Sequence, residues 1–88
     1  MLRSKTNSYT FFVPQVGKFK FQPTRYDENN NLLCALYRKS SNKWKCKLTG
    51  RYNFEKEEFE IIWQYEGFLE NPKHKKLLTY TLKQYDWK

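Results

Sequence analysis

The chain has 88 residues, and its 17 Lys and Arg against nine Asp and Glu give a formal net charge of +8. A chain of this length can form one compact domain but not two, and its charge favours a polyanionic partner such as nucleic acid. No run approaches the roughly 20 apolar residues of a membrane-spanning helix, and the apolar run Phe11–Val13 is too short for a secretory signal, so we expect a soluble cytoplasmic protein with no membrane partner.

The first part of the chain is basic and contains one clear strand. We expect residues 1–8 to form a basic N-terminal arm and residues 9–88 to form a single β-rich domain. Polar and apolar side chains alternate over Lys18–Gln22, which is typical of a strand with one buried and one wet face. Turn-forming residues precede this strand at Pro14–Gly17 and follow it at Asp27–Asn31.

The middle of the chain predicts a β-hairpin. Leu32–Tyr37 lacks alternation, as a strand covered on both faces would, and Lys43–Leu48 alternates strictly. Ser40–Asn42 is a short hairpin loop between them. We expect a register in which the numbers of two paired residues add to an even number. In that register one face of the hairpin is wet and carries Leu33, Ala35, Tyr37, Lys43, Lys45 and Lys47. The opposite face forms a core layer of Cys34, Leu36, Trp44, Cys46 and Leu48.

The last third predicts one further strand and an ambiguous segment. A turn at Asn53–Glu57 leads into alternation over Glu58–Glu66, which Ile62 interrupts once. Asn71 followed by Pro72 would suit the start of a helix, with Leu78, Leu82 and Tyr85 on one face. The segment Leu78–Leu82 also alternates, however, and this favours a last strand.

These elements predict an all-β or β-rich α+β fold. The spacing of about ten residues between turns is typical of a small antiparallel meander or partly closed barrel of five to six strands. Its last segment would be a strand or a short helix.

The basic residues predict an interface with nucleic acid. Thirteen of the 17 are Lys, and because Lys binds phosphate as a mobile point charge while Arg reads base edges, we expect backbone contacts with little base specificity. Tyr37 is the ring expected on the basic face, with Tyr26 and Tyr52 as rings in loops, so DNA or RNA in single-stranded form is slightly preferred. The candidate binding residues are Lys18, Lys20, Tyr37, Arg38, Lys39, Lys43, Lys45, Lys47 and Arg51.

Three other interpretations stay open. The lysines could serve only to solvate the sheet and prevent edge-to-edge aggregation. The acidic stretch between Glu55 and Glu70 would instead suit a non-enzymatic inhibitor or adaptor that binds an acidic protein surface or a nucleic-acid-processing enzyme. A small ribonuclease of toxin type would use His74, the single histidine, as its base.

No constellation of residues indicates catalysis, a metal site or a cofactor. Cys34 and Cys46 could come opposite each other in the hairpin, but we expect two buried thiols in a reducing compartment. With His74 they would supply three zinc ligands at no recognised spacing, where a structural site needs four. Three glycines are too few for a phosphate-binding loop, so we expect a binding protein and not an enzyme.

Overall fold

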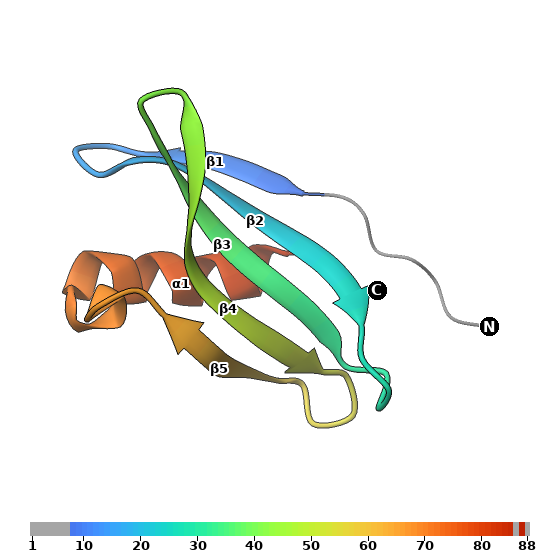
Figure 1. The fold of residues 1–88 in the computed structure, drawn as a ribbon. Helices are drawn as coiled ribbons and strands as arrows, with labels where there is room; N and C mark the ends of the chain where they lie inside the picture. The colour runs from blue at the N-terminus through green and yellow to red at the C-terminus, as the bar shows by residue number, and fades with distance from the viewer. Residues whose placement is uncertain (1–7, 86, 88) are drawn as a thin grey trace.

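The computed structural model describes residues 8–85 and 87, so the predicted N-terminal arm lies outside the described residues except for Ser8 (Figure 1). Each strand pairs antiparallel with its neighbours in the chain, in the order β1-β2-β3-β4-β5. The elements are β1 (Tyr9–Val13), β2 (Gly17–Tyr26), β3 (Leu32–Ser40), β4 (Lys43–Asn53), β5 (Glu58–Gln64), the 3₁₀ helix η1 (Phe68–Glu70) and α1 (Pro72–Gln84).

This architecture confirms the predicted β-rich fold, an antiparallel meander whose sheet stays open. The preference for a C-terminal strand was wrong, because residues from Pro72 onward form α1. Asn71 caps this helix by accepting a hydrogen bond from the backbone N–H of Lys73 at 2.9 Å, and Pro72 supplies a suitable first position. Leu78 and Leu82, whose alternation with polar residues suggested a strand, are also four residues apart, and this spacing places both on one side of a helix.

The core lies between the sheet and α1, which passes behind the sheet in Figure 1. From the sheet, Phe19 and Phe21 of β2 are fully buried, and from α1, Leu77 and Leu78 are nearly so. The Thr81 hydroxyl is buried with them and donates to the Leu77 carbonyl at 2.8 Å, which satisfies the hydroxyl within the helix. The helix therefore covers one face of the sheet only. The other face, which we call the open face, is left without a covering element among the described residues.

The predicted turns are present, and several use left-handed backbone. Ser41 and Asn42 form the two-residue loop between β3 and β4 with φ angles of 50° and 64°, the geometry of a turn that matches the twist of a hairpin. Asn30 and Glu57 also have positive φ in the two predicted polar turns. Asn tolerates this conformation because its short side chain can hydrogen-bond the nearby backbone, which suits Asn30 to the turn between β2 and β3.

A β-bulge corrects the predicted faces of the hairpin. Leu36 pairs with Leu48, but the next pair is Tyr37 with Cys46, so β4 carries Lys47 as one extra residue. One inserted residue moves every following side chain to the opposite face. The predicted register, in which the numbers of two paired residues add to an even number, therefore holds only from Leu48 onward along β4. Trp44 and Cys46, predicted in the core, lie on the open face with Tyr37, while Lys43 and Lys45 lie on the other.

None of the described helices has the length and apolar character required to cross a membrane.

Candidate functional site

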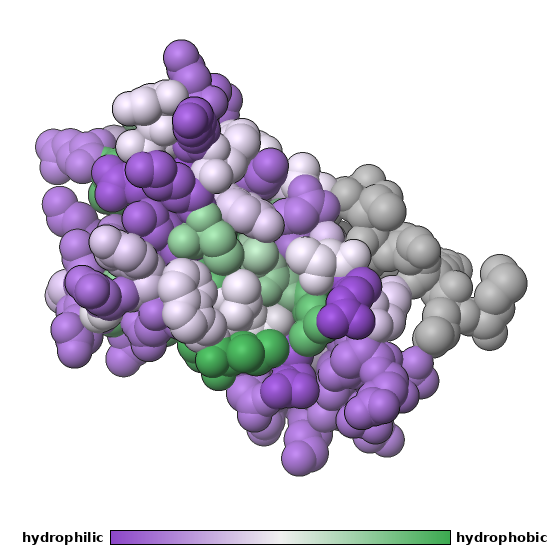
Figure 2. Space-filling view, in the orientation of Figure 1, coloured by the Kyte–Doolittle hydropathy of each residue, from purple (hydrophilic) through white to green (hydrophobic). Residues whose placement is uncertain are grey.

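The open face of the sheet carries the strongest candidate site. Figure 2 views this face, with α1 behind it, and shows an apolar centre bordered by hydrophilic side chains. The centre follows from the pairing of Ala35 with Thr49 and of Thr49 with Trp63, which form one row across β3, β4 and β5. Trp63 is 47% exposed, so a large ring lies in contact with solvent at the edge of this row.

Next to the apolar centre lies a cluster that we call the lysine–aromatic cluster, made of Lys20, Tyr37, Lys39 and Trp44. The pairs Lys20–Tyr37 and Lys39–Trp44 place all four on the open face at the end near the β3–β4 loop. The ammonium of Lys20 lies 5.3 Å from the centroid of the Tyr37 ring and 4.8 Å from that of Trp44. The ammonium of Lys39 lies 5.9 Å from the Trp44 ring. Two cations thus contact the same half-buried indole.

The cluster continues onto β1. Lys18 alternates with Lys20 on β2 and pairs with Phe12, and both side chains are exposed. Phe12 is 69% exposed, an unusual position for a phenylalanine. The open face therefore presents lysines and aromatic rings side by side from β1 to β4.

The other predicted binding residues are placed elsewhere. Arg38 faces α1, where its guanidinium lies 6.0 Å from the Phe19 ring and donates to the Val16 carbonyl. Lys45 pairs with Arg38 and shares its side of the sheet, as does Lys43 by alternation. Lys47 lies at the bulge, with its ammonium 4.1 Å from the Tyr65 ring, and lines a hollow with Arg38 on the helix side.

Arg51 is on the open face but at its opposite end, where acidic residues engage it. Its guanidinium lies 2.8 Å from the Glu60 carboxylate and 3.7 Å from that of Asp27. Asp27 also accepts from the backbone N–H groups of Asn29 and Asn31, each at 2.9 Å, and these bonds lower the pKa of Asp27 despite an opposing desolvation effect. Two carboxylates of the same protein therefore already engage the Arg51 guanidinium. The structure brings together Lys18, Lys20, Tyr37 and Lys39 from the predicted set, and separates the other five.

Trp44 is the site residue that sequence reasoning missed. The strict alternation of Lys43–Leu48 assigns Trp44 to the core, and nothing in that alternation indicates the bulge at Lys47. The two-residue loop could have revealed the position of Trp44. It pairs Ser40 with Lys43, so near the loop the register is shifted by one residue from the predicted one, and Trp44 falls on the open face. Of the other rings suggested for stacking, Tyr52 is buried and packs on Trp87 with centroids 3.8 Å apart.

The two cysteines differ in environment, and this gives a testable prediction. Cys34 is buried in the core and Cys46 is half-buried on the open face, and both are free thiols. Burial raises the pKa of Cys34 to about 12, so its thiol stays protonated until pH approaches that value and reacts slowly below it. We expect iodoacetamide at neutral pH to label Cys46 well before Cys34, and both at similar rates after unfolding.

Mass spectrometry of the labelled peptides measures this difference. Equal labelling rates for Cys34 and Cys46 in the folded protein would contradict the assignment of the two thiols to opposite faces.

His74 packs within the structure at the start of α1. Its ring stacks on Phe68, with centroids 4.1 Å apart and an interplanar angle of 11°, and its Nδ1 lies 2.9 Å from the Phe68 carbonyl oxygen. A carbonyl accepts only, so Nδ1 carries the proton of this bond. The arrangement joins η1 to α1. No three His, Cys, Asp or Glu side chains come together as metal ligands in residues 8–85 and 87.

Comparison of the chain with models of protein families, with curated proteins and with solved structures found no match.

Proposed function

We propose that this chain binds single-stranded nucleic acid, DNA or RNA, on the open face of its sheet, mainly through the phosphate backbone. The observation that carries the proposal is the lysine–aromatic cluster, in which Lys20 lies between the rings of Tyr37 and Trp44 on a face that no described element covers. Exposed cations beside accessible rings are the two components that nonspecific single-strand binders combine.

Each component has a separate task in the proposed complex. Lys18, Lys20 and Lys39 contact phosphates as mobile point charges, and their release of counterions supplies most of the affinity. The rings of Tyr37 and Trp44 stack on bases, which works with any base because each has a π face. In the free protein Lys20 and Lys39 occupy these ring faces, so binding exchanges a cation–π contact for a cation–phosphate contact and a ring–base contact.

The rings favour a single strand over a duplex. In a duplex both faces of each base stack on neighbouring bases, so a protein ring can reach them only after unstacking, which costs free energy. An unpaired strand offers its base faces directly. The open face also lacks a protruding helix among the described elements, and an α-helix is the commonest element for reading the major groove. Little base specificity is expected.

The salt dependence of binding tests the proposal. Changing Lys18, Lys20 and Lys39 to Gln removes three phosphate contacts, so the slope of log K against log[salt] should become shallower by about 2, at ~0.7 per phosphate on a single strand. Fluorescence anisotropy of a labelled oligothymidine or oligouridine over a series of salt concentrations measures the slope.

The matched control changes Lys56, Lys75 and Lys83 to Gln. These exposed lysines lie in the β4–β5 turn and on α1, and their loss lowers the net charge by the same three units, from +8 to +5. The control should keep the slope of the unmodified protein. An equal change of slope in both triple variants would show that overall charge, and not the open face, carries the binding.

A further inference from the structure

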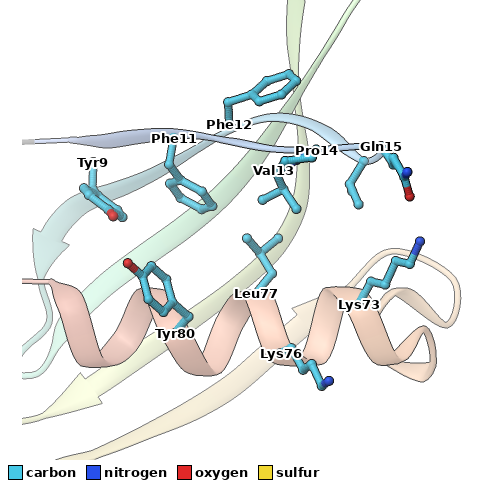
Figure 3. Close-up of a pocket in the computed structure, with 11 residues that line it drawn as sticks. Tyr9, Phe11, Phe12, Val13, Pro14, Gln15, Lys73, Lys76, Leu77 and Tyr80 are labelled. Atoms are coloured by element: carbon cyan, nitrogen blue, oxygen red, sulfur yellow. The ribbon is translucent and has the colours of Figure 1, made fainter.

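A second surface, on the opposite side of the sheet from the lysine–aromatic cluster, lies between β1 and α1. Figure 3 shows Tyr9, Phe11 and Val13 pointing from β1 toward the helix, while Leu77 and Tyr80 point from the helix toward β1. The space between them is a groove of about 510 Å³, within the range of ligand-binding pockets. Phe12 also contributes to the lining, but its ring points away from the helix, toward the open face. We call this space the β1–α1 groove.

Among the described residues, nothing pairs with or covers the strand edge above the groove. Within the described part of the chain β1 pairs with β2 alone, so its outer edge leaves backbone N–H and C=O groups without strand partners. Exposed edges usually carry charges, proline or a bulge that prevent pairing with another chain. The β5 edge follows this rule, with Glu58, Glu60 and a bulge at Ile62. The residues of β1, Tyr9–Val13, include no charge and no proline.

The charge around the groove is positive. Lys73 and Lys76 line it, and none of its lining residues is acidic. Lys73 points toward β1 beside Gln15, at the end of the groove nearest the β1–β2 turn, whereas Lys76 points away from β1 (Figure 3). The first turn of α1 carries no acid either. An occupant with a carboxylate near Lys73 would therefore complement the groove.

We propose that the β1–α1 groove binds an extended acidic peptide segment of another protein, which adds to the sheet as a strand beside β1. Main-chain hydrogen bonds to the β1 edge hold the segment, the mode known from other exposed sheet edges. Side chains at alternate positions point toward α1: apolar ones enter between Phe11, Leu77 and Tyr80, and an acidic one near the β1–β2 turn pairs with Lys73. An antiparallel segment places that acid toward its N-terminal end.

A second copy of this chain fits the groove less well. Its own β1 has no acidic residue to meet Lys73, and the pairing would bring together two bodies that each carry a net charge of +8. Its β5 edge does carry Glu58 and Glu60, but Arg51 of the same protein already engages Glu60 at 2.8 Å, and the bulge at Ile62 interrupts that edge and disfavours pairing with another strand.

Binding of a synthetic peptide tests the proposal. The probe is fluorescein-labelled Glu-Thr-Glu-Thr-Leu-Thr-Val-Thr, and its controls are the same peptide with Lys in place of Glu and with N-methylated alternate residues. We expect saturable one-to-one binding of the first peptide only, because N-methylation removes the backbone donors of the added strand. Changing Lys73 and Lys76 to Glu should weaken binding about tenfold and favour the Lys peptide.

The matched control changes Lys75 and Lys83 to Glu, which alters the charge of α1 equally at positions outside the groove. This variant should bind the acidic peptide within about twofold of the unmodified protein. Equal losses in both variants, unimpaired binding of the N-methylated peptide, or concentration-dependent dimers in sedimentation that the peptide does not disperse would each overturn the proposal. The Tyr37→Ala/Trp44→Ala variant should keep its peptide affinity, which separates this surface from the open face.

Discussion

Replacing Tyr37 and Trp44 together by Ala is expected to weaken the binding of a single-stranded oligonucleotide by roughly a hundredfold. Stacking of one base on one ring contributes about 1–3 kcal/mol, and ~1.4 kcal/mol for each ring corresponds to a factor of ten apiece. Both rings lie on the open face, with their centroids 5.3 and 4.8 Å from the Lys20 ammonium, so their bases would be neighbours on one strand. Anisotropy titrations at a fixed salt concentration measure the change.

The salt dependence distinguishes this loss from the loss of lysines. Removing two rings removes no phosphate contact, so affinity should fall while the slope of log K against log[salt] stays the same. The control is Tyr65→Ala/Tyr80→Ala, which removes two rings that are 48% and 56% exposed and lie off the open face. That variant should bind as the unmodified protein does. An effect as large as that of Tyr37→Ala/Trp44→Ala would contradict a stacking site at the cluster.

The second large effect is expected from Phe21→Ala, which should cost about 3–5 kcal/mol of unfolding free energy. Phe21 is fully buried where the sheet meets the C-terminal segment, with ring centroids 5.2 Å from Tyr85, 6.0 Å from Trp87 and 6.1 Å from Phe59. A domain of this length has only about 4–13 kcal/mol in total. The change should therefore remove much of the stability and loosen the attachment of α1.

Urea denaturation followed by circular dichroism measures this loss. The matched control is Phe12→Ala, the same substitution on the neighbouring strand at a side chain that is 69% exposed, and it should change stability by about 0.5 kcal/mol or less. Similar unfolding midpoints for the two variants would contradict the assignment of Phe21 to the core and Phe12 to the open face.

Four of the five strands, and the turns, were predictable because local residue patterns determine them. The strand β1 was not predicted, since Phe11–Val13 is apolar throughout and shows no alternation. Alternation over Lys18–Gln22 and Glu58–Glu66, together with polar turns near Asn30 and Ser41, requires no tertiary information. The single break in alternation at Ile62 marks a real irregularity. Thr49 pairs with Trp63 and Gly50 with Ile61, so Ile62 is the extra residue of a bulge. The break in alternation at Ile62 thus indicated the bulge, which was not predicted from the sequence.

The faces of the central hairpin depended on two requirements that conflict. The loop Ser41–Asn42 pairs Ser40 with Lys43, whereas the core needs Leu36 opposite Leu48, and these two registers differ by one residue. A bulge at Lys47 satisfies both. Alternation alone favours the core register throughout, so it assigns Trp44 to the wrong face. Loop geometry acts at short range, and it decides the register for the residues closest to the loop.

The C-terminal helix depended on packing that the local pattern does not express. Strand-forming residues at Leu78–Leu82 compete with the cap at Asn71, and the local preferences are close to balanced. The meander offers one apolar face lined by Phe19, Phe21 and Leu36, and α1 buries Leu77, Leu78 and Thr81 on the same side. A helix lying across the sheet covers this face, whereas a sixth strand would leave it exposed to water. Tertiary burial therefore determined the outcome.

A titration followed by two-dimensional NMR tests the central claim most directly. With the backbone amides and the three indole N–H groups assigned, a single-stranded oligothymidine or oligouridine is added at low salt. We predict that the indole signal of Trp44 and the amides of Lys18, Lys20, Tyr37 and Lys39 shift together and saturate, while the indole signal of the packed Trp87 stays in place. Shifts confined to α1 and the β1–α1 groove, or no shifts at all, would contradict nucleic-acid binding on the open face.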